Sequence, residues 1–391
     1  MPALIPRPRH LARVTALLRQ FPVVAVLGAR QVGKTTLARQ RGARGRGDRA
    51  AVFDLEDAGD LARLQDPLLA LRHQRGLVVI DEVQRLPRLF EALRVLVDEP
   101  PRSRRFLLLG SASPELLRQS SETLAGRIAY HELGGLEVAE VGAARLERLW
   151  HRGGFPRAYL ARSDAASALW REEFIRTFLE RDVPQLGLRI PAPALRRFWT
   201  MIAHYHAQTW NASELARAFG VAHTTVQRYL DVLTETYLVR QLAPWHENLA
   251  KRQVRAPKVY LRDSGVLHAL LGMRTSRELE SHPKVGASWE GFALNAVLDR
   301  LGVRMGEAYF WATYAGAELD LLVVRGRIRL GFEFKRTTAP RVTPSMRTAL
   351  RDLRLQRLDV VHGGRHSYLL GERIRAVAFE RLMEDVVPLR G

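Results

Sequence analysis

The chain has 391 residues, of which 47% are hydrophobic and 26% charged, enough to bury two or three cores in two to four domains. The net charge of +20 favours a polyanionic partner, with nucleic acid ahead of an acidic membrane surface. The chain has no cysteine, no apolar signal core near residue 1 and no membrane-length apolar run, so disulfide frameworks, thiolate chemistry and membrane spans are excluded and we expect a cytoplasmic protein.

The first motif follows an apolar, β-branched run, FPVVAVL at 21–27, which predicts a strand. GARQVGKTT then matches G-x-x-x-x-G-K-[ST] in full, in the strand–loop–helix setting that the motif requires. We expect this loop to bind ATP with backbone N–H groups around the phosphates, with Lys34 on the β- and γ-phosphates and the Thr35 hydroxyl on Mg²⁺. The ATP-binding residues that this predicts are Gly28, Gly33, Lys34, Thr35 and Thr36.

Two acidic residues end a second predicted strand, GLVVIDE at 76–82, whose apolar run is typical of a strand buried on both faces. We expect Asp81 to hold the magnesium ion through water and Glu82 to polarise the attacking water. A third strand, FLLLG at 106–110, ends in Ser111.

Together, GARQVGKTT, FDLED at 53–57, VVIDEVQRLP, LLLGSAS, LAGR and GGFPRAYL resemble the bacterial and archaeal AAA-type ATPases whose C-terminal half is a domain of unknown function with a nuclease-like core. The resemblance runs from about residue 10 to about residue 385. It implies that Ser111 senses the γ-phosphate. It also implies that Arg127 reaches a neighbouring subunit's nucleotide, in a homo-oligomeric ring. The alternative for Arg127 is an ordinary solvated charge.

The middle of the chain predicts a helical lid followed by a winged helix. LWREEFIRTFLERDV has helical apolar spacing, and SELARAF, Gly220 and HTTVQRYLDVLTETY predict a helix-turn-helix with a strand after it. Its second helix would put side chains in or near a DNA groove. KRQVRAPK at 251–258 would add positive charge where a wing would meet phosphates. The alternative is that the winged helix serves as a structural lid or a protein contact. We interpret His204 and His206 as helix-surface histidines. The predicted DNA contacts are His223, Thr224, Thr225, Gln227 and Arg228.

A charged hairpin is predicted at 317–335. If Gly326-Arg327 form the two-residue turn, Asp320 faces Glu333, and Phe332 and Phe334 point to the other side. Two facing carboxylates destabilise a bare hairpin, whereas a divalent cation such as Mg²⁺ between them reverses that cost.

Upstream of the hairpin, SWEGFALNAVLDRL predicts a buried helix that carries Glu290. Helix glutamate, strand aspartate and then Glu-x-Lys resemble the core of PD-(D/E)xK nucleases. The resemblance implies a metal site at Glu290, Asp320 and Glu333, with Lys335 as the lysine of a phosphodiesterase centre. The alternative is a fold that keeps these residues without cleaving.

The predicted fold is therefore α/β: a P-loop ATPase domain with a helical lid and a winged helix, followed by an α/β restriction-endonuclease-like domain. The expected function is ATP hydrolysis by an oligomer acting on DNA, with metal-dependent binding or cleavage by the C-terminal domain. The alternatives are an ATP-driven motor, for example for branch migration, with an inactive nuclease fold, a nucleotide-switched regulator, and a toxin-like or defence enzyme. The predicted domains are 1–145 (ATPase), 146–200 (lid), 201–275 (winged helix) and 280–391 (nuclease-like).

Overall fold

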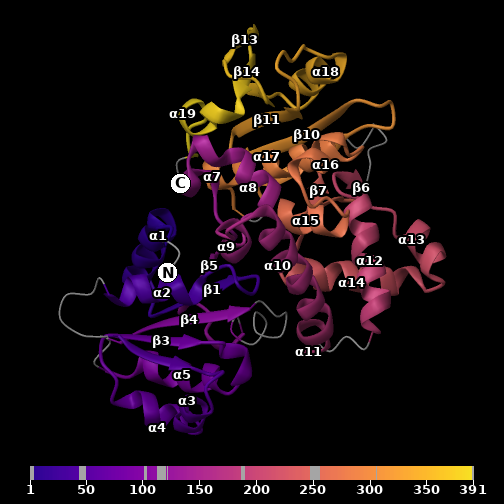
Figure 1. Cartoon of the computed structure of the whole chain (residues 1–391). Helices are drawn as coiled ribbons and strands as arrows, with labels where there is room; N and C mark the ends of the chain where they lie inside the picture. Colours follow the sequence, from indigo (N-terminus) through magenta and orange to yellow (C-terminus); the bar gives the residue numbers. More distant parts are fainter. Residues whose placement is uncertain are drawn as a thin grey trace. The chain divides into compact units, whose positions relative to one another are not determined.

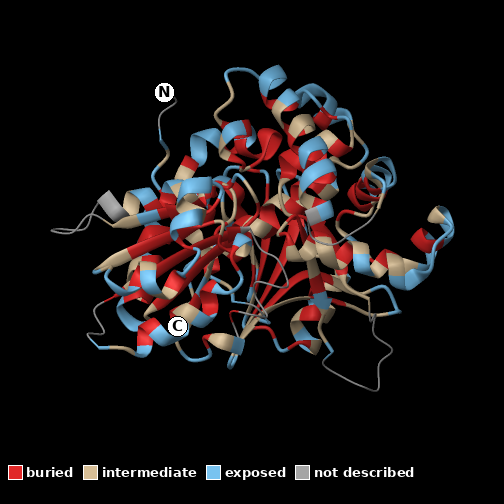
Figure 2. Ribbon diagram, turned by 90° about the horizontal axis from the view of Figure 1, so that it is seen from below, coloured by how far each residue is buried: buried red, intermediate tan, exposed pale blue. Residues whose placement is uncertain are grey.

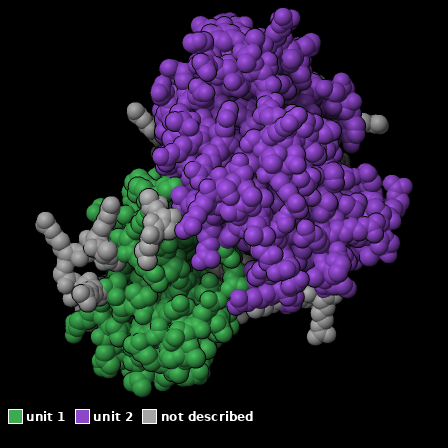
Figure 3. Space-filling view, in the orientation of Figure 1, with its two compact units in different colours: residues 1–135, 235–237 green, residues 136–234, 238–391 purple. Residues whose placement is uncertain are grey.

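The structure is a computed structural model that divides into two compact units (Figures 1 and 3). Unit 1 comprises residues 1–135 with 235–237, and unit 2 comprises residues 136–234 with 238–391. The residues that the structure describes are 4–43, 50–100, 104–111, 120, 122–185, 190–246, 256–304 and 306–389.

Unit 1 is built on a five-stranded sheet in which every strand pair is parallel, in the order β2-β3-β4-β1-β5. Parallel neighbours need crossover connections, and most of the helices of this unit lie within those connections. Because all the strands run the same way, their carboxyl ends meet at one edge of the sheet. The elements are α1 (Pro8–Gln20), β1 (Val23–Gly28), α2 (Lys34–Ala43), β2 (Ala51–Asp54), α3 (Ala58–Arg63), α4 (Pro67–Arg72), β3 (Leu77–Asp81), α5 (Leu89–Asp98), β4 (Arg105–Ser111) and β5 (Ile128–Glu132).

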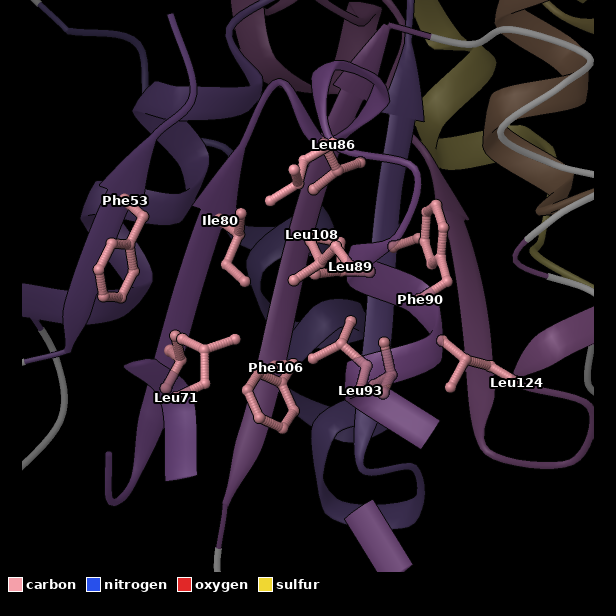
Figure 4. Close-up of a cluster of buried hydrophobic side chains, with 14 of the residues drawn as sticks. Phe53, Leu71, Ile80, Leu86, Leu89, Phe90, Leu93, Phe106, Leu108 and Leu124 are labelled. Carbon is pink, nitrogen blue, oxygen red and sulfur yellow. The ribbon is translucent and has the colours of Figure 1, made fainter. Parts of the chain in front are cut away.

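The apolar runs predicted as strands are buried in this sheet. Every residue of β1 is buried, as are the last four residues of β3. Figure 4 shows side chains of β2, β3 and β4 packing against helices α4 and α5 in one core. This core fixes the strand ends that carry the first motif.

Unit 2 contains a nine-stranded mixed sheet, in the order β13-β14-β12-β11-β10-β9-β7-β8-β6. Figure 2 shows the strands of the protein mostly buried, with exposed residues on its helices and loops. Its helices are α7 (Val138–Val141), α8 (Leu146–Arg152), α9 (Pro156–Tyr159), α10 (Asp164–Thr177), α11 (Val183–Gln185), α12 (Ala192–His204), α13 (Ala212–Phe219), α14 (His223–Glu235), α15 (Ser264–Leu270), α16 (Ser276–Ser281), α17 (Val285–Leu301), α18 (Pro344–Asp352) and α19 (Leu382–Asp385). Its strands are β6 (Gln208–Thr209), β7 (Val239–Pro244), β8 (Lys258–Leu261), β9 (Ala308–Ala312), β10 (Glu318–Arg325), β11 (Ile328–Lys335), β12 (Arg357–His362), β13 (Tyr368–Gly371) and β14 (Ile374–Ala378).

The nine-stranded sheet joins two parts of the chain that the sequence analysis treats separately. Strand β7 follows the predicted helix-turn-helix and pairs with β8, and its end pairs in parallel with β9 through Ala243 and Pro244. The backbone N–H of Trp245 also donates to the carbonyl of Phe310 at 2.7 Å. Strands β6 to β8 are therefore continuous with the sheet that carries the charged hairpin.

The GGFPRAYL segment packs tightly against the start of α15. Asp263 accepts hydrogen bonds from the backbone N–H of Gly154 at 2.7 Å and of Val266 at 2.8 Å. Gly153 has a φ of +80°, and a Cβ there would lie 2.2 Å from the Asp263 carboxylate. A side chain at position 153 is therefore excluded by backbone conformation and by space.

Candidate functional site

The first candidate site is the loop between β1 and α2. Gly33 has a φ of +98° and Gln31 a φ of +64°. A Cβ on Gly28 would lie 2.1 Å from the carbonyl oxygen of Leu133, which follows β5. The two motif glycines are thus required for different reasons, one for close backbone approach and one for a left-handed turn.

Lys34 lies inside this loop and is 5% exposed. Its ammonium donates to the carbonyl oxygens of Gly28 at 3.1 Å and Ala29 at 3.0 Å. Burial lowers the pKa of Lys34 to about 8, and the nearby carboxylates of Glu82 and Asp81 partly offset that effect. A buried ammonium held by two carbonyls is placed to bind an anionic group that enters the loop.

The acidic end of β3 meets the start of α2. The Thr35 hydroxyl donates to Asp81 Oδ2 at 2.6 Å, and Asp81 Oδ1 accepts from the Glu82 backbone N–H at 2.9 Å. These oxygen donors suit Mg²⁺, so the residues present fit the ion that the motif implies. Burial raises the pKa of Glu82 and of Asp81. A carboxylate with a raised pKa is a better acceptor for a proton from water at neutral pH.

Two residues that were not identified from the sequence support this site. Gln84 donates from its side-chain amide to Glu82 Oε2. Arg7 donates to the carbonyls of Val32 at 3.3 Å and Gly134 at 3.0 Å, which connects the loop to the segment after β5. Gln84 lies only two residues from a predicted catalytic residue, whereas no local pattern marks Arg7.

The remaining predicted residues of unit 1 are placed as follows. Thr36 lies on α2 and is exposed. Ser111 ends β4 and pairs with Gly28 of β1 in the sheet, but its side chain lies outside the described residues. Arg127 makes a bidentate ion pair with Asp98, at 2.9 and 2.8 Å.

Arg127 lies at the end of the sheet where β1 begins. The loop between β1 and α2, the phosphate-binding loop, lies at the other end of that strand. The carbonyl of Arg127 accepts from the N–H of Val23, the first residue of β1, whereas the loop follows the last residue of that strand. Six strand residues separate the two ends by roughly 17 Å. Arg127 therefore does not serve the nucleotide site of its own chain.

The predicted helix-turn-helix consists of α13 and α14. Asn211 caps α13 by accepting from the N–H of Glu214, and Gly220 adopts the left-handed conformation that ends it. His223, Thr224 and Arg228 are exposed on α14, and Thr225 is half-buried. Gln227 is half-buried: it accepts from Trp210 Nε1 at 3.1 Å and donates to Asp231 at 2.9 Å, so its amide is hydrogen-bonded within the fold.

The second candidate site lies on the hairpin of β10 and β11. The strands pair in the predicted register, from Leu321↔Phe332 to Arg325↔Ile328, and Gly326 has a φ of +59° in the turn. One further pair along the same ladder places Asp320 opposite Glu333. Both are buried, at 6% and 4% exposure.

The two carboxylates interact strongly. Asp320 Oδ2 accepts from the backbone N–H of Phe334 at 3.0 Å. Burial, together with the charge of Asp320, raises the pKa of Glu333 to about 9. Lys335, on the same strand, lies 3.1 Å from Glu333 Oε2 and has a half-exposed side chain. The hairpin thus presents a buried carboxylate pair with an accessible ammonium beside it.

Glu290 reaches this site from α17 and is held by a tyrosine. The hydroxyl of Tyr260, on β8, donates to Glu290 Oε1 at 2.7 Å. Burial, with the charge of Asp320 second, raises the pKa of Glu290 to about 7. Helix α17 is buried over most of its circumference, as its apolar sequence predicts.

The role predicted for Lys258 was wrong. This lysine was expected to add surface charge to the stretch 251–258, of which 251–255 lie outside the described residues. Instead it is 4% exposed, its ammonium binds Glu318, and it lies 3.7 Å from both Glu290 Oε1 and Asp320 Oδ1. Burial opposes its charge, but the three carboxylates outweigh that effect and raise its pKa.

The carboxylate oxygens of the second site are ligands of the kind that Mg²⁺ or Mn²⁺ prefers. Their arrangement is not that of a closed set of metal ligands. Glu290, Asp320 and Glu333 do not bring one ligand atom each within 4.8 Å of one another. A lysine ammonium lies between two of them.

The histidines of HYH are not a surface pair. His204 is exposed, but His206 is buried and its Nδ1 accepts from the backbone N–H of Leu261 at 3.0 Å. Burial lowers the pKa of His206 to about 3, so it is neutral and structural.

Comparison with known proteins identifies the first unit's family. Residues 20–142 match the model of the AAA domain, and residues 143–277 and 285–382 match two domains of unknown function. Two uncharacterized proteins, from Mycobacterium bovis and Mycobacterium tuberculosis, are each 50% identical over 380 residues, covering 97% of this chain and 85% of theirs. The chain belongs to their family. It is an AAA-type P-loop ATPase by its first domain.

Two solved structures match this chain at low sequence identity and low TM-score. The Walker-type ATPase of Pyrococcus abyssi is 14% identical with a TM-score of 0.47, and covers 68% of this chain and 96% of that one. The RuvB Holliday junction branch migration motor of Thermotoga maritima is 20% identical with a TM-score of 0.32, and covers 61% and 90%. Across the described part of the chain, no helix combines the length and apolar character that crossing a membrane requires.

Proposed function

We propose that this AAA-type ATPase hydrolyses ATP in unit 1 as a homo-oligomer and acts on DNA through unit 2. The observation that carries the proposal is the buried Lys34, beside Thr35, Asp81 and Glu82 at the carboxyl ends of the strands. When bound, ATP-Mg²⁺ would be held by the loop backbone, Lys34, Thr35 and Asp81. Glu82 would accept a proton from the attacking water.

The test of ATP hydrolysis compares Lys34→Ala and Glu82→Gln with wild type. Lys34→Ala should abolish ATP binding, because no side-chain cation then faces the phosphates. Glu82→Gln should bind ATP but turn it over about 10²–10⁴-fold more slowly, because the general base is gone. Binding is measured with a fluorescent ATP analogue and turnover by phosphate release.

Glu91→Gln, an exposed residue on α5, is the matched control for the loss of charge and should behave as wild type. Equal turnover by wild type and Glu82→Gln would remove the assignment of Glu82.

We propose DNA as the partner of unit 2, through a winged helix formed by α12, α13, α14 and strands β6 to β8. Three features support this: the strands β6, β7 and β8 that flank α13 and α14 in the chain and pair in the order β6-β8-β7, the exposed His223, Thr224 and Arg228 on α14, and the net charge of +20. The acidic site of β10, β11 and α17 would bind a divalent cation beside a DNA phosphate. Lys335 would contact that phosphate, in either a gripping or a cleaving enzyme.

DNA binding should weaken steeply with salt, because basic residues that contact phosphates release counterions. Arg228→Gln should reduce the slope of log affinity against log salt by about one, if Arg228 contacts a phosphate. Fluorescence anisotropy on single-stranded, duplex and branched DNA measures both quantities. Arg277→Gln, exposed on α16, is the control for charge.

The alternative function is a nucleotide-switched regulator that uses the same helices to contact a protein. It is favoured by the internal hydrogen bonds of Gln227, which engage the amide of one predicted DNA-contacting side chain. DNA affinity that does not change between low and moderate salt would favour this alternative.

A further inference from the structure

A buried lysine lies where the acidic site of unit 2 would hold its cation. The ammonium of Lys258 contacts Glu318 and lies 3.7 Å from one oxygen each of Glu290 and Asp320. Glu290 and Asp320 are two of the three proposed metal ligands. An ammonium at this distance from both carboxylates neutralises the same charge that a divalent cation would neutralise.

The fold positions this ammonium through strand pairing and burial. Lys258 is the first residue of β8, the middle strand of β6-β8-β7, and pairs with Thr209 on one side and Leu242 on the other. Its side chain is 5% exposed and its Nζ lies 5.6 Å from the centre of the Phe310 ring. Tyr260, two residues along the same strand, donates to Glu290. One strand therefore supplies both a cation and a hydrogen-bond donor to the acidic site.

The charges of the site explain why a lysine can be buried there. Glu290, Asp320 and Glu333 are buried or nearly so, and ionised carboxylates in a protein interior are costly unless a cation compensates them. Lys258 supplies that compensation for Glu290 and Asp320 without any bound metal. The three carboxylates do not form a set of ligand atoms within 4.8 Å of one another, and the ammonium lies 3.7 Å from oxygens of two of them, Glu290 and Asp320.

We propose that Lys258 is an internal competitor for the divalent cation of this site, so that a metal ion binds strongly only when the Lys258 ammonium leaves the carboxylates. The inference rests on the proposed metal site and adds its regulation. Strands β6 and β7, which precede and follow the helix-turn-helix in the chain, both pair with β8, so a partner that shifts these strands would also shift the ammonium.

The test measures Mn²⁺ binding to the full-length, nucleotide-free protein by electron paramagnetic resonance and by isothermal titration calorimetry. Lys258→Met should bind one Mn²⁺ at least about tenfold more tightly than wild type, because the competing charge is gone. Adding Asp320→Asn to Lys258→Met should remove this gain, which assigns the ion to the acidic site rather than to the P-loop. Lys284→Met, which removes the same charge at the start of α17, should bind Mn²⁺ as wild type does.

Lys258→Gln covers the case in which Lys258→Met fails to fold, since the amide can still donate to Glu318. In both variants the melting temperature should rise more with added Mn²⁺ than in wild type. Mn²⁺ affinity in Lys258→Met or Lys258→Gln that is equal to or below that of wild type overturns the inference.

The outcome for the proposed metal site is separate. Tight Mn²⁺ binding by wild type with no gain in either variant rejects the competitor role and leaves the metal site standing. Tight binding by the variants alone supports the competitor role and rejects a metal-loaded site in the isolated wild-type protein. Absence of binding in every variant rejects both.

Discussion

Of the four lysines that the structure describes, three lie against acidic or carbonyl groups, each in a different setting. Lys34 is held by two carbonyls in the phosphate-binding loop, Lys258 is buried among carboxylates, and Lys335 extends from Glu333 toward solvent. A compact ammonium suits all three positions, because a planar guanidinium needs more room and a fixed fork of partners. In this arginine-rich chain, three of the few lysines therefore lie at the two candidate functional sites.

His268 gives a residue-level prediction about pH. It is fully buried, its Nδ1 donates to the His151 carbonyl at 2.9 Å, and its Nε2 lies 2.7 Å from the Ser288 hydroxyl. Burial lowers its pKa to about 3, from 6.5 in an exposed histidine. Between these two values the unfolded chain binds a proton that the folded chain does not. Stability conferred by this group therefore falls as the pH falls from 6.5 towards 3.

We expect wild type to lose about 2 kcal/mol more unfolding free energy than His268→Gln between pH 7 and pH 5. The measurement is urea unfolding of both proteins at each pH. Using the difference between the two proteins cancels the effects of the other titrating groups. Parallel pH profiles for the two proteins would show that His268 is protonated in the folded state.

At the scale of elements, the contact between GGFPRAYL and α15 depends on the absence of side chains. Gly153→Ala would place a methyl group 2.2 Å from the Asp263 carboxylate, in a backbone conformation that glycine favours. We expect a loss of about 3 kcal/mol in unfolding free energy, from strain and overpacking together. Thermal and urea unfolding measure it.

Gly272→Ala is the matched control for this prediction. Gly272 also has a positive φ, of +77°, but a Cβ there would meet nothing within 4 Å. Its substitution should cost only about 1–2 kcal/mol, from the backbone alone. Equal losses for the two variants would mean that the close approach to Asp263 contributes nothing.

The charged hairpin shows what can be predicted for one element. Alternation and the Gly326-Arg327 turn were enough to predict the register, because the turn length fixes which residues face each other. The β-bulge between Leu319 and Leu322 on the side of β9 was not predictable from this pattern. Nor was the cation beside Asp320, since Lys258 lies 62 positions earlier in the chain.

At the scale of the whole molecule, the position of Arg127 leads to a prediction about the assembly of subunits. In the single chain Arg127 is paired with Asp98, at the sheet edge away from the phosphate-binding loop. A catalytic role would therefore require a second subunit and release from Asp98. Arg127→Ala should lower ATP turnover about a thousandfold if it stabilises a neighbour's transition state.

Mixing Arg127→Ala with Lys34→Ala subunits should restore part of the turnover, because some interfaces then combine an intact loop with an intact arginine. Phosphate release across a series of mixing ratios measures this. Arg94→Ala, exposed on α5, is the control for charge and should be active alone. Mixtures that never exceed the sum of the separate variants would contradict a role in trans.

The sequence by itself determined the nucleotide site and much of the local structure. The phosphate-binding loop, the acidic end of β3, the turn at Gly220 and the hairpin register depend on residues close together in the chain, where glycine conformation, apolar runs and turn length act directly. Tertiary structure alone decided the rest. Arg7 reaches Gly134, β7 pairs with β9, Gln227 turns to Trp210, and Lys258 enters the acidic site. These contacts join residues far apart in sequence, and a basic side chain has the same local pattern whether it meets solvent or a buried carboxylate.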